Sequence, residues 1–320
     1  MISVRDLHKS YAAFHAVRGI TFDAPKGQVV GLLGPNGAGK TTTIRIITGY
    51  LPADRGSVSV LGADTLEDSA RARSQIGYLP ESSPLYPEMR TIDYLRFRAR
   101  LFKVPSSRVR AAVEQAIDRC WLAEVRRKRI GHLSKGYKQR VGLAAAILHD
   151  PAVIILDEPT NGLDPSQIVE MRRLIRELGR DRTLLVSSHI LSEVEKTCDR
   201  VVVIARGRVR ADGPPGDLLR QASRNAPCRI EFLPPDDNAR QAILAALGAL
   251  PNVREVTLDT PSTSDEPLRT RCLLVPVDDA DPREDAAALI TRAGGRLREI
   301  TRETATLEKV FMRAIEGDDA

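Results

Sequence analysis

Cysteine is scarce in this chain of 320 residues, and its four cysteines lie far apart. No two of them form a CxxC motif, the spacing that redox centres and most structural zinc sites use. We therefore expect reduced, packed thiols without metal or redox chemistry at Cys120, Cys198, Cys228 and Cys272.

Long apolar runs are also missing. A helix that crosses a bilayer needs about 20 consecutive apolar residues, and the chain has no run of that length. The N-terminal stretch MISVRDLHKS has neither the charged start nor the apolar block of a signal peptide. Both features lead us to expect a cytoplasmic protein without a membrane span.

Aromatic residues make up only 4% of the chain, and they do not interleave with blocks of Lys or Arg as in proteins that bind single-stranded nucleic acids. The net charge of +6 is uneven, because residues 1–217 carry +10 and residues 218–320 carry −4. The basic part could face nucleotide phosphates, a membrane surface, nucleic acid or simply solvent. We expect no nucleic-acid partner.

The first two thirds of the chain alternate strand and helix patterns. Buried-strand runs and helical patterns follow one another at 28–33, 40–49, 153–156, 168–178, 183–188 and 201–204. Such alternation predicts an α/β fold with a largely parallel sheet. From about 85 to 140 the pattern is helical only, with Thr91 and either Ser106 or Ser107 as expected N-caps. We read this segment as a helical subdomain inserted in the α/β core.

A GPPG stretch at 213–216 ends this alternation. Beyond residue 227 the predicted order is strand, helix, strand, strand, helix, strand, with a polar loop at 259–267 and a last helix at 306–315. That order is typical of a ferredoxin-like α+β sandwich. We therefore predict two domains, 1–217 and 218–320, and find no chemical motif in the second.

Residues 34–41 read GPNGAGKT, which matches GxxxxGK[ST] between a predicted strand and a predicted helix. Successive backbone N–H groups and a helix N-terminus form a concave anion site, and glycines let the backbone wrap phosphates. Lys40 would place its charge on the β- and γ-phosphates, and Thr41 would offer its hydroxyl to Mg²⁺. The loop predicts a site for ATP and Mg²⁺ formed by Gly34, Pro35, Asn36, Gly37, Ala38, Gly39, Lys40, Thr41 and Thr42.

Two adjacent carboxylates follow the buried strand in VIILDE, residues 153–158. Because side chains alternate along a strand, Asp157 can face Mg²⁺ while Glu158 faces a water molecule. Glu158 would then be a general base or water-orienting group for attack on the γ-phosphate. The alternative is a solvated acidic turn before Pro159.

Two further segments carry weaker signals. In LSKGY, residues 133–137, Ser134 is an expected N-cap and Gly136 allows close backbone approach, which creates a second helix N-terminus suited to an anion. His189 follows the strand at 183–188 and could donate a hydrogen bond to a γ-phosphate at the sheet edge. A structural histidine is the alternative.

Residues 1 to about 217 resemble the nucleotide-binding subunit of an ABC transporter. The resemblance rests on five motifs that occur in this order: GPNGAGKT, LSKGY, VIILDEP, NGLD and SSH. The resemblance implies a P-loop ATPase in which Lys40, Glu158 and His189 are catalytic and His189 senses the γ-phosphate. It implies a head-to-tail homodimer that sandwiches two ATP molecules. It also implies nucleotide contacts from Tyr11, which would stack on adenine, from the dimer-facing loop that ends at Asp164, and from the signature residues Ser134, Lys135, Gly136 and Tyr137.

The chain departs from the commonest family pattern in the signature and in IGYLPESSPLY. Lys135 and Tyr137 stand where the family usually has Gly and Gln, and Glu81 stands where Gln is usual. Gln offers a neutral oxygen to Mg²⁺ or to its water, whereas Glu adds a negative charge near the triphosphate. We expect Glu81 to act through the water shell of the metal, and an ordinary loop carboxylate is the alternative.

The chain is similar to the ABC-2 exporter ATPases, which include gliding-motility and copper-enzyme-maturation systems. The similarity lies in YLPE-SSPLY, in LSKGY, in the appended domain and in the ending LEKVFMRAI. This similarity implies a separate integral membrane permease, export, and a peripheral place on the inner face of the membrane. A coupling segment of the permease would dock beside the Glu81 loop and the helix at 92–102. The alternative is a soluble ABC ATPase that acts on DNA or ribosomes, although the chain has one cassette and no heptad run.

Overall fold

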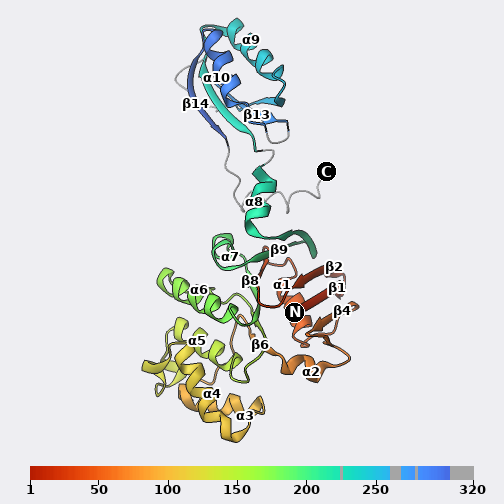
Figure 1. Ribbon diagram of the computed structural model, residues 1–320, viewed down its shortest axis with the longest axis vertical. Helices are drawn as coiled ribbons and strands as arrows, with labels where there is room; N and C mark the ends of the chain where they lie inside the picture. Colours follow the sequence, from red (N-terminus) through yellow and green to blue (C-terminus); the bar gives the residue numbers. More distant parts are fainter. Residues whose placement is uncertain (224–225, 260–267, 278–279, 303–320) are drawn as a thin grey trace. The chain divides into compact units, whose positions relative to one another are not determined.

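The computed structural model describes residues 1–223, 226–259, 268–277 and 280–302. Contacts divide the chain into two bodies, one formed by Met1–Pro215 and the other beginning at Gly216 (Figure 1). The helix predicted at 306–315 and nearly all of the polar loop predicted at 259–267 lie outside the described residues.

A mainly parallel sheet forms the centre of the first body. In the described chain its order is β10-β9-β3-β8-β7-β6, and only the β9–β10 hairpin is antiparallel. The strands are β3 (Val29–Leu33), β6 (Ile76–Leu79), β7 (Val153–Leu156), β8 (Thr183–Ser188), β9 (Arg200–Ala205) and β10 (Arg208–Gly213). Every residue of β3, β7 and β8 is buried, as expected for strands covered on both faces. The predicted parallel α/β sheet is confirmed.

A second, antiparallel sheet was not anticipated from the sequence. Its order is β2-β1-β4-β5, from β1 (Ile2–Tyr11), β2 (Phe14–Ala24), β4 (Arg55–Val60) and β5 (Ala63–Asp64). Side chains of this sheet, of helix α1 (Lys40–Ile47) and of one face of the central sheet form a continuous apolar core. The β1–β2 hairpin matters for the site because its end brings Tyr11 opposite Phe14.

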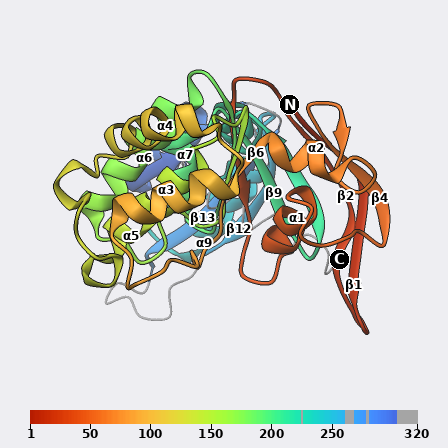
Figure 2. The ribbon, with the colours of Figure 1, turned by 90° about the horizontal axis from the view of Figure 1, so that it is seen from below.

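The helical segment lies on the other side of the central sheet from β1, β2 and β4 (Figure 2). It contains α3 (Thr91–Leu101), α4 (Ser106–Arg119), two short 3-10 helices (Ala123–Val125 and Ile130–His132) and α5 (Lys135–Ala146). The expected N-cap at Ser134 is confirmed, since its hydroxyl accepts from the Tyr137 N–H at 3.4 Å. The other two expected caps are wrong, because Thr91 and Ser106 are already the first helical residues.

The remaining helices of the first body are α2 (Ser69–Ser74), α6 (Pro165–Gly179) and α7 (Leu191–Thr197). Helix α7 packs on β3, and α6 packs on β8. Asp164 is the N-cap of α6, and its carboxylate accepts from the Gln167 N–H at 2.9 Å. Among the described residues no helix is both long and apolar enough to span a membrane.

The second body is a small α+β unit. After α8 (Pro215–Ser223) come β11 (Cys228–Leu233), α9 (Asp237–Gly248), β12 (Val253–Leu258), β13 (Thr270–Pro276), α10 (Arg283–Arg292) and β14 (Arg296–Arg302). The four strands described there form an antiparallel sheet in the order β12-β13-β11-β14. Its apolar core lies between the sheet and helices α9 and α10, with Phe232 fully buried.

Candidate functional site

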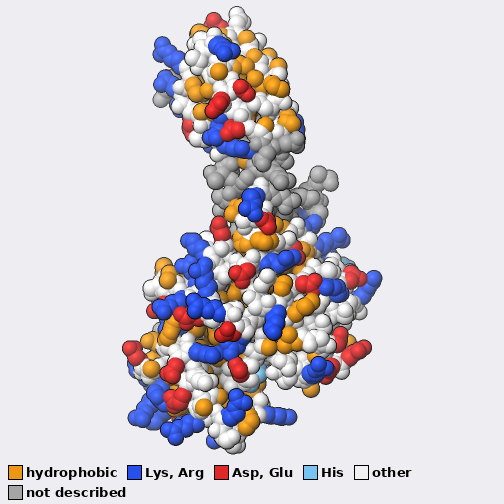
Figure 3. All heavy atoms as spheres, viewed as in Figure 1, with side chains coloured by type: hydrophobic (Ala, Val, Ile, Leu, Met, Phe, Trp, Pro, Cys, Tyr) orange, Lys and Arg blue, Asp and Glu red, His pale blue; other side chains and the backbone are white. Residues whose placement is uncertain are grey.

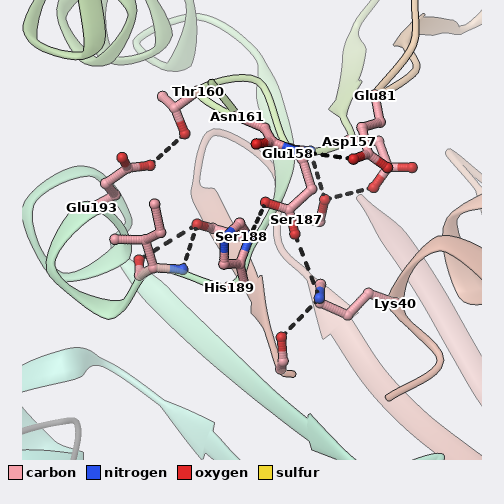
Figure 4. Close-up of polar contacts among 12 residues, drawn as sticks. Lys40, Glu81, Asp157, Glu158, Thr160, Asn161, Ser187, Ser188, His189 and Glu193 are labelled. Atoms are coloured by element: carbon pink, nitrogen blue, oxygen red, sulfur yellow. Dashed lines mark hydrogen bonds and ion pairs between the residues drawn. The ribbon is translucent and has the colours of Figure 1, made fainter. Parts of the chain in front are cut away.

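Three neighbouring parallel strands end at one edge of the central sheet, and each leads into a predicted site segment. The phosphate loop follows β3, Asp157 and Glu158 follow β7, and His189 follows β8. Ligands bind at the carboxyl ends of strands in such sheets. Figure 4 shows Lys40, Glu158 and His189 pointing toward one another there.

The phosphate loop has a backbone that its glycines make possible. Gly37 and Gly39 have φ values of 79° and 104°, which residues with a Cβ rarely adopt. A Cβ on Gly39 would lie 2.5 Å from the Ala16 carbonyl oxygen, and a Cβ on Gly34 would lie 2.3 Å from that of Ile204. The first turn of α1 contains no acidic residue. The loop and helix therefore leave N–H groups turned toward a concave anion site, which fits a polyphosphate.

Lys40 carries the positive charge of this site. Its side chain is only 6% exposed, and its Nζ donates to the carbonyl oxygens of Gly34 at 2.7 Å and Pro35 at 3.3 Å. The same Nζ lies 3.4 Å from Glu158 Oε1. The ammonium group is thus held at the mouth of the loop, where it can exchange these partners for phosphate oxygens.

Asp157 is almost completely buried and faces the start of α1. The Ser187 hydroxyl donates to its Oδ1 at 2.7 Å. Burial raises the pKa of Asp157, and the nearby charges of Glu158 and Glu81 add to the rise, whereas hydrogen bonds to Ser187 and Thr41 oppose it. A nearby cation would favour the charged form of such a carboxylate.

These residues fit Mg²⁺ when it arrives with a nucleotide. Among the described residues, no group of three His, Cys, Asp or Glu side chains is arranged to hold a metal ion alone. Mg²⁺ is commonly bound by one or two protein oxygens together with water and substrate phosphates. The hydroxyl of Thr41 and the carboxylate of Asp157 could supply such oxygens.

Glu158 has a different environment from its neighbour. It lies beyond the end of β7 in a left-handed conformation, with φ of 49°. Oε2 accepts a hydrogen bond from His189 Nδ1 at 2.8 Å, and the backbone N–H donates to Ser187 Oγ at 2.8 Å. The two carboxylates therefore face different partners because of this strained turn, rather than because of the strand alternation that we had assumed from the sequence.

A cavity of about 350 Å³ connects these groups. Of the predicted residues, Tyr11, Glu81, Glu158, His189 and the loop from Pro35 to Thr42 line it. Asn161, the first residue of the predicted dimer-facing loop, lines it as well. Phe14 and Ala16 also line it, although the sequence analysis did not assign them to the site. Phe14 had a signal that we missed, since it is an aromatic residue three positions after Tyr11 in YAAF. Ser187 was also missed, although it precedes the Ser188–His189 pair that we noted. Its hydroxyl donates to the Asp157 carboxylate and accepts from the backbone N–H of Glu158.

The predicted signature is not part of this cavity, and neither is Asp164. Gly136 packs so closely on α6 that a Cβ there would lie 2.6 Å from the side chain of Gln167. A Cβ on Gly162 would likewise lie 2.1 Å from the ammonium nitrogen of Lys135. The signature and the loop before α6 therefore contact each other within one chain, while the nucleotide role of both segments stays a prediction.

Glu81 joins the two regions. Its exposed Oε1 accepts from Asn161 Nδ2 at 3.0 Å. Besides the first cavity, Glu81 and Asn161 line a neighbouring one of about 350 Å³ that also contacts Lys135 and Lys138. Glu81 is thus placed between the phosphate loop and the signature of its own chain, while its role toward the metal stays a prediction.

Comparisons with known proteins agree with this geometry. The family profile described as ABC transporter matches residues 17–161, and a profile described as an AAA domain matches residues 128–195. The chain is 35% identical to the Nod factor export ATP-binding protein I of Burkholderia orbicola, over 84% of this chain and 88% of the relative.

It is also 32% identical to the linearmycin resistance ATP-binding protein LnrL of Bacillus subtilis, over 81% of this chain and 82% of the relative. A solved ATP-binding subunit of an ABC transporter superposes with a TM-score of 0.63 at 33% identity, over 69% of this chain and 92% of that chain. The chain therefore belongs to the family of ABC transporter ATP-binding subunits, and it is an ATPase.

Proposed function

We propose that a homodimer of this chain hydrolyses ATP to power a separate ABC-2 type membrane permease that works as an exporter. The observation that carries the proposal is the convergence of Lys40, Asp157, Glu158 and His189 on the phosphate loop at one sheet edge. The relative named for Nod factor export supports the export direction. The homodimer would sit on the inner face of the membrane.

Each residue of the site has a role in hydrolysis. Lys40 binds the β- and γ-phosphates, while Tyr11 and Phe14 offer aromatic surface to the adenine. Mg²⁺, when bound by Thr41 and Asp157, neutralises charge that develops on the phosphoryl oxygens. Glu158 accepts the proton of the attacking water. His189 orients the Glu158 carboxylate through the 2.8 Å hydrogen bond, whose proton must be on Nδ1 because a carboxylate only accepts.

The position of the signature supports a dimer. Ser134 and Lys135, at the start of α5, are exposed and lie outside the cavity of the same chain. A second copy in head-to-tail arrangement would bring Ser134–Tyr137 over that cavity. Two composite ATP sites would then form in one closed, two-fold symmetric dimer.

A larger groove supports a membrane partner. A cavity of about 650 Å³ lies between the end of α1, the loop after β6 and α3. Tyr50, which is 80% exposed, lines it together with Tyr78, Tyr94 and Phe102. Aromatic surface of this kind is typical of protein interfaces. The groove adjoins the Glu81 loop, because Pro80 and Ser82 line it while Glu81 lines the ATP cavity.

The second body completes the proposed architecture. We infer that it is ferredoxin-like, because the strand order β12-β13-β11-β14 and the alternation of strands with α9 and α10 match that pattern.

The proposal is tested by expressing the chain together with a polytopic membrane protein encoded next to it. We expect the two proteins to purify as one complex, with ATP hydrolysis stimulated by the permease. Replacing the exposed Tyr50 in the groove by Glu should abolish the complex while leaving basal hydrolysis intact. A chain that instead purifies with ribosomes or DNA, without a membrane protein, would support the soluble ABC ATPase and overturn the exporter.

A further inference from the structure

The basic charge of the first body is concentrated in one segment. Residues 85–140 contain 15 Lys and Arg against 5 Asp and Glu, whereas the rest of residues 1–217 contains 19 of each. In Figure 3 blue side chains gather at the lower end of the molecule, over the helices labelled α3 and α4 in Figure 1. The ATP site accounts for little of this excess, since Lys40 lies outside the segment and Lys135 is the one cation of the signature within it.

A cavity of about 460 Å³ lies beneath the turn that joins α3 and α4. Three cationic residues line it, namely Lys103, Arg108 and Arg119, and all three are exposed. Within the described part of the chain none of the three forms an ion pair, in contrast to Arg126 of the same segment, which contacts Glu114 at 2.7 Å. Unpaired cations around a cavity favour a ligand with negative charge.

Apolar side chains form part of the lining of this cavity. Phe102, Val104, Ala112 and Leu148 line it beside the cations. Leu101, directly before Phe102, is 58% exposed and adds apolar surface at the end of α3. Cations beside an apolar wall match a molecule that is anionic at one end and apolar at the other.

His149 adds a specific polar feature to the same cavity. Its Nε2 donates to the Ile76 carbonyl oxygen at 3.1 Å, and burial lowers its pKa and so favours the neutral ring. Its Nδ1 is then an acceptor, and this buried atom has no hydrogen-bond partner among the described residues. The neutral ring therefore adds no positive charge to those of Lys103, Arg108 and Arg119.

We propose that this basic cavity, defined by Lys103, Arg108 and Arg119, binds the headgroup of an anionic phospholipid and so holds the helical segment against the membrane surface. Phe102 lines both this cavity and the groove proposed for the permease. The cavity therefore opens next to the place where a membrane partner would dock. The preference for a lipid over a nucleic acid rests on the proposed function, and each additional Lys or Arg near an anionic bilayer contributes about 1 kcal/mol.

The test measures flotation of the full-length chain with phosphatidylglycerol-containing vesicles and with phosphatidylcholine vesicles, in the absence of any permease. We expect binding to the anionic vesicles that weakens as salt is raised. The triple change Lys103→Gln, Arg108→Gln and Arg119→Gln should weaken it about a hundredfold, because three such contributions are lost. ATP hydrolysis should stay at the wild-type level, which also shows that the variant is folded.

A matched control removes three exposed cations from the second body, with Arg254→Gln, Arg292→Gln and Arg296→Gln. This control lowers the net charge by three, as the cavity variant does, and should leave vesicle binding unchanged. Ala111 lines the cavity, and Ala111→Phe, which keeps every charge but occupies part of the space, should weaken binding to phosphatidylglycerol.

Equal loss of vesicle binding in both triple variants would overturn the proposal, because net charge alone would then explain it. So would equal binding to phosphatidylcholine, unchanged binding of Ala111→Phe, or binding to duplex DNA or RNA in place of vesicles. Failure of this test leaves the permease complex intact as a separate result, so the two proposals fail independently.

Discussion

At the scale of single residues, Ser187 explains how two adjacent carboxylates acquire different partners. Its hydroxyl donates to Asp157 at 2.7 Å and accepts the backbone N–H of Glu158 at 2.8 Å. The second bond stabilises the left-handed turn at Glu158, a conformation that costs about 1–3 kcal/mol in a residue with a side chain. Asp157 is thereby held toward Thr41, and Glu158 toward Lys40 and His189.

Replacing Glu158 by Gln tests its role as general base. The amide keeps the size of the side chain but cannot accept the proton of water, so we expect hydrolysis to fall by roughly 10²- to 10⁴-fold. ATP binding should persist, and ATP should trap a dimer. Phosphate release and size-exclusion chromatography measure both effects, with Glu195→Gln on the surface of α7 as control. Steady-state hydrolysis near the wild-type rate would refute the assignment.

Replacing Glu81 by Gln tests whether this carboxylate couples ATP turnover to the permease. Gln can still contact Asn161, which Glu81 now does at 3.0 Å, but it removes a negative charge that raises the pKa of Asp157. We expect a higher Mg²⁺ requirement for hydrolysis, because a negative charge near the cation is lost, and a changed stimulation by the permease. Titrations with Mg²⁺, with and without the permease, measure these effects. If neither quantity changes, Glu81 is an ordinary loop carboxylate.

At the scale of elements, the phosphate loop depends on close backbone approach. In Gly39→Ala the new Cβ would meet the Ala16 carbonyl oxygen at 2.5 Å, so β2 or the loop must move. We expect loss of ATP binding and a destabilisation of about 1–3 kcal/mol.

Gly27→Ala is the matched control for Gly39→Ala. It also has a positive φ, of 75°, but open space around the new Cβ. Equilibrium nucleotide binding and denaturant unfolding distinguish the two variants, and equal effects of both would show that backbone strain alone matters.

In the second body a buried carboxylate links β11 to β13. Burial alone would raise the pKa of Glu231, but hydrogen bonds from Arg271 and Arg269 outweigh burial and hold the pKa below its usual 4.5. Because the folded-state pKa is lowered, this network stabilises the body above the ordinary carboxylate pKa. The stabilisation is lost as the pH falls through the folded-state value.

Glu231→Gln should therefore lower the stability of the second body at neutral pH and leave it less sensitive to acid. Hydrogen exchange of β11 amides in the full chain, followed from pH 7 to pH 3, measures this difference. Exchange in the variant that depends on pH as steeply as in the wild type, after correction for the intrinsic rate, would contradict the prediction.

At the scale of the whole molecule, each proposed ATP site takes its phosphate loop from one chain and its signature from another. Lys40→Ala destroys the first contribution, and Ser134→Arg blocks the second. We expect each variant alone to be inactive and a mixture of the two to regain hydrolysis, because mixed dimers contain one intact composite site. Phosphate release from the separate and mixed proteins measures this. Wild-type activity of Ser134→Arg alone would exclude the composite site.

The sequence by itself determined the parallel α/β core and the phosphate loop. GPNGAGKT and VIILDE depend on local backbone geometry and on short buried strands, and both features can be read from consecutive residues. Capping was less predictable, as Thr91 and Ser106 show, because a helix can begin one residue earlier when contacts elsewhere fix its start.

The tertiary structure alone decided which separate segments meet. The pairing of β1 with β4 and the contacts of Ser187 with Asp157 and Glu158 join segments that are far apart in the sequence. The left-handed turn at Glu158 and the cavity beneath the α3–α4 turn have the same origin. Such features depend on packing between distant residues, which no window of consecutive residues encodes.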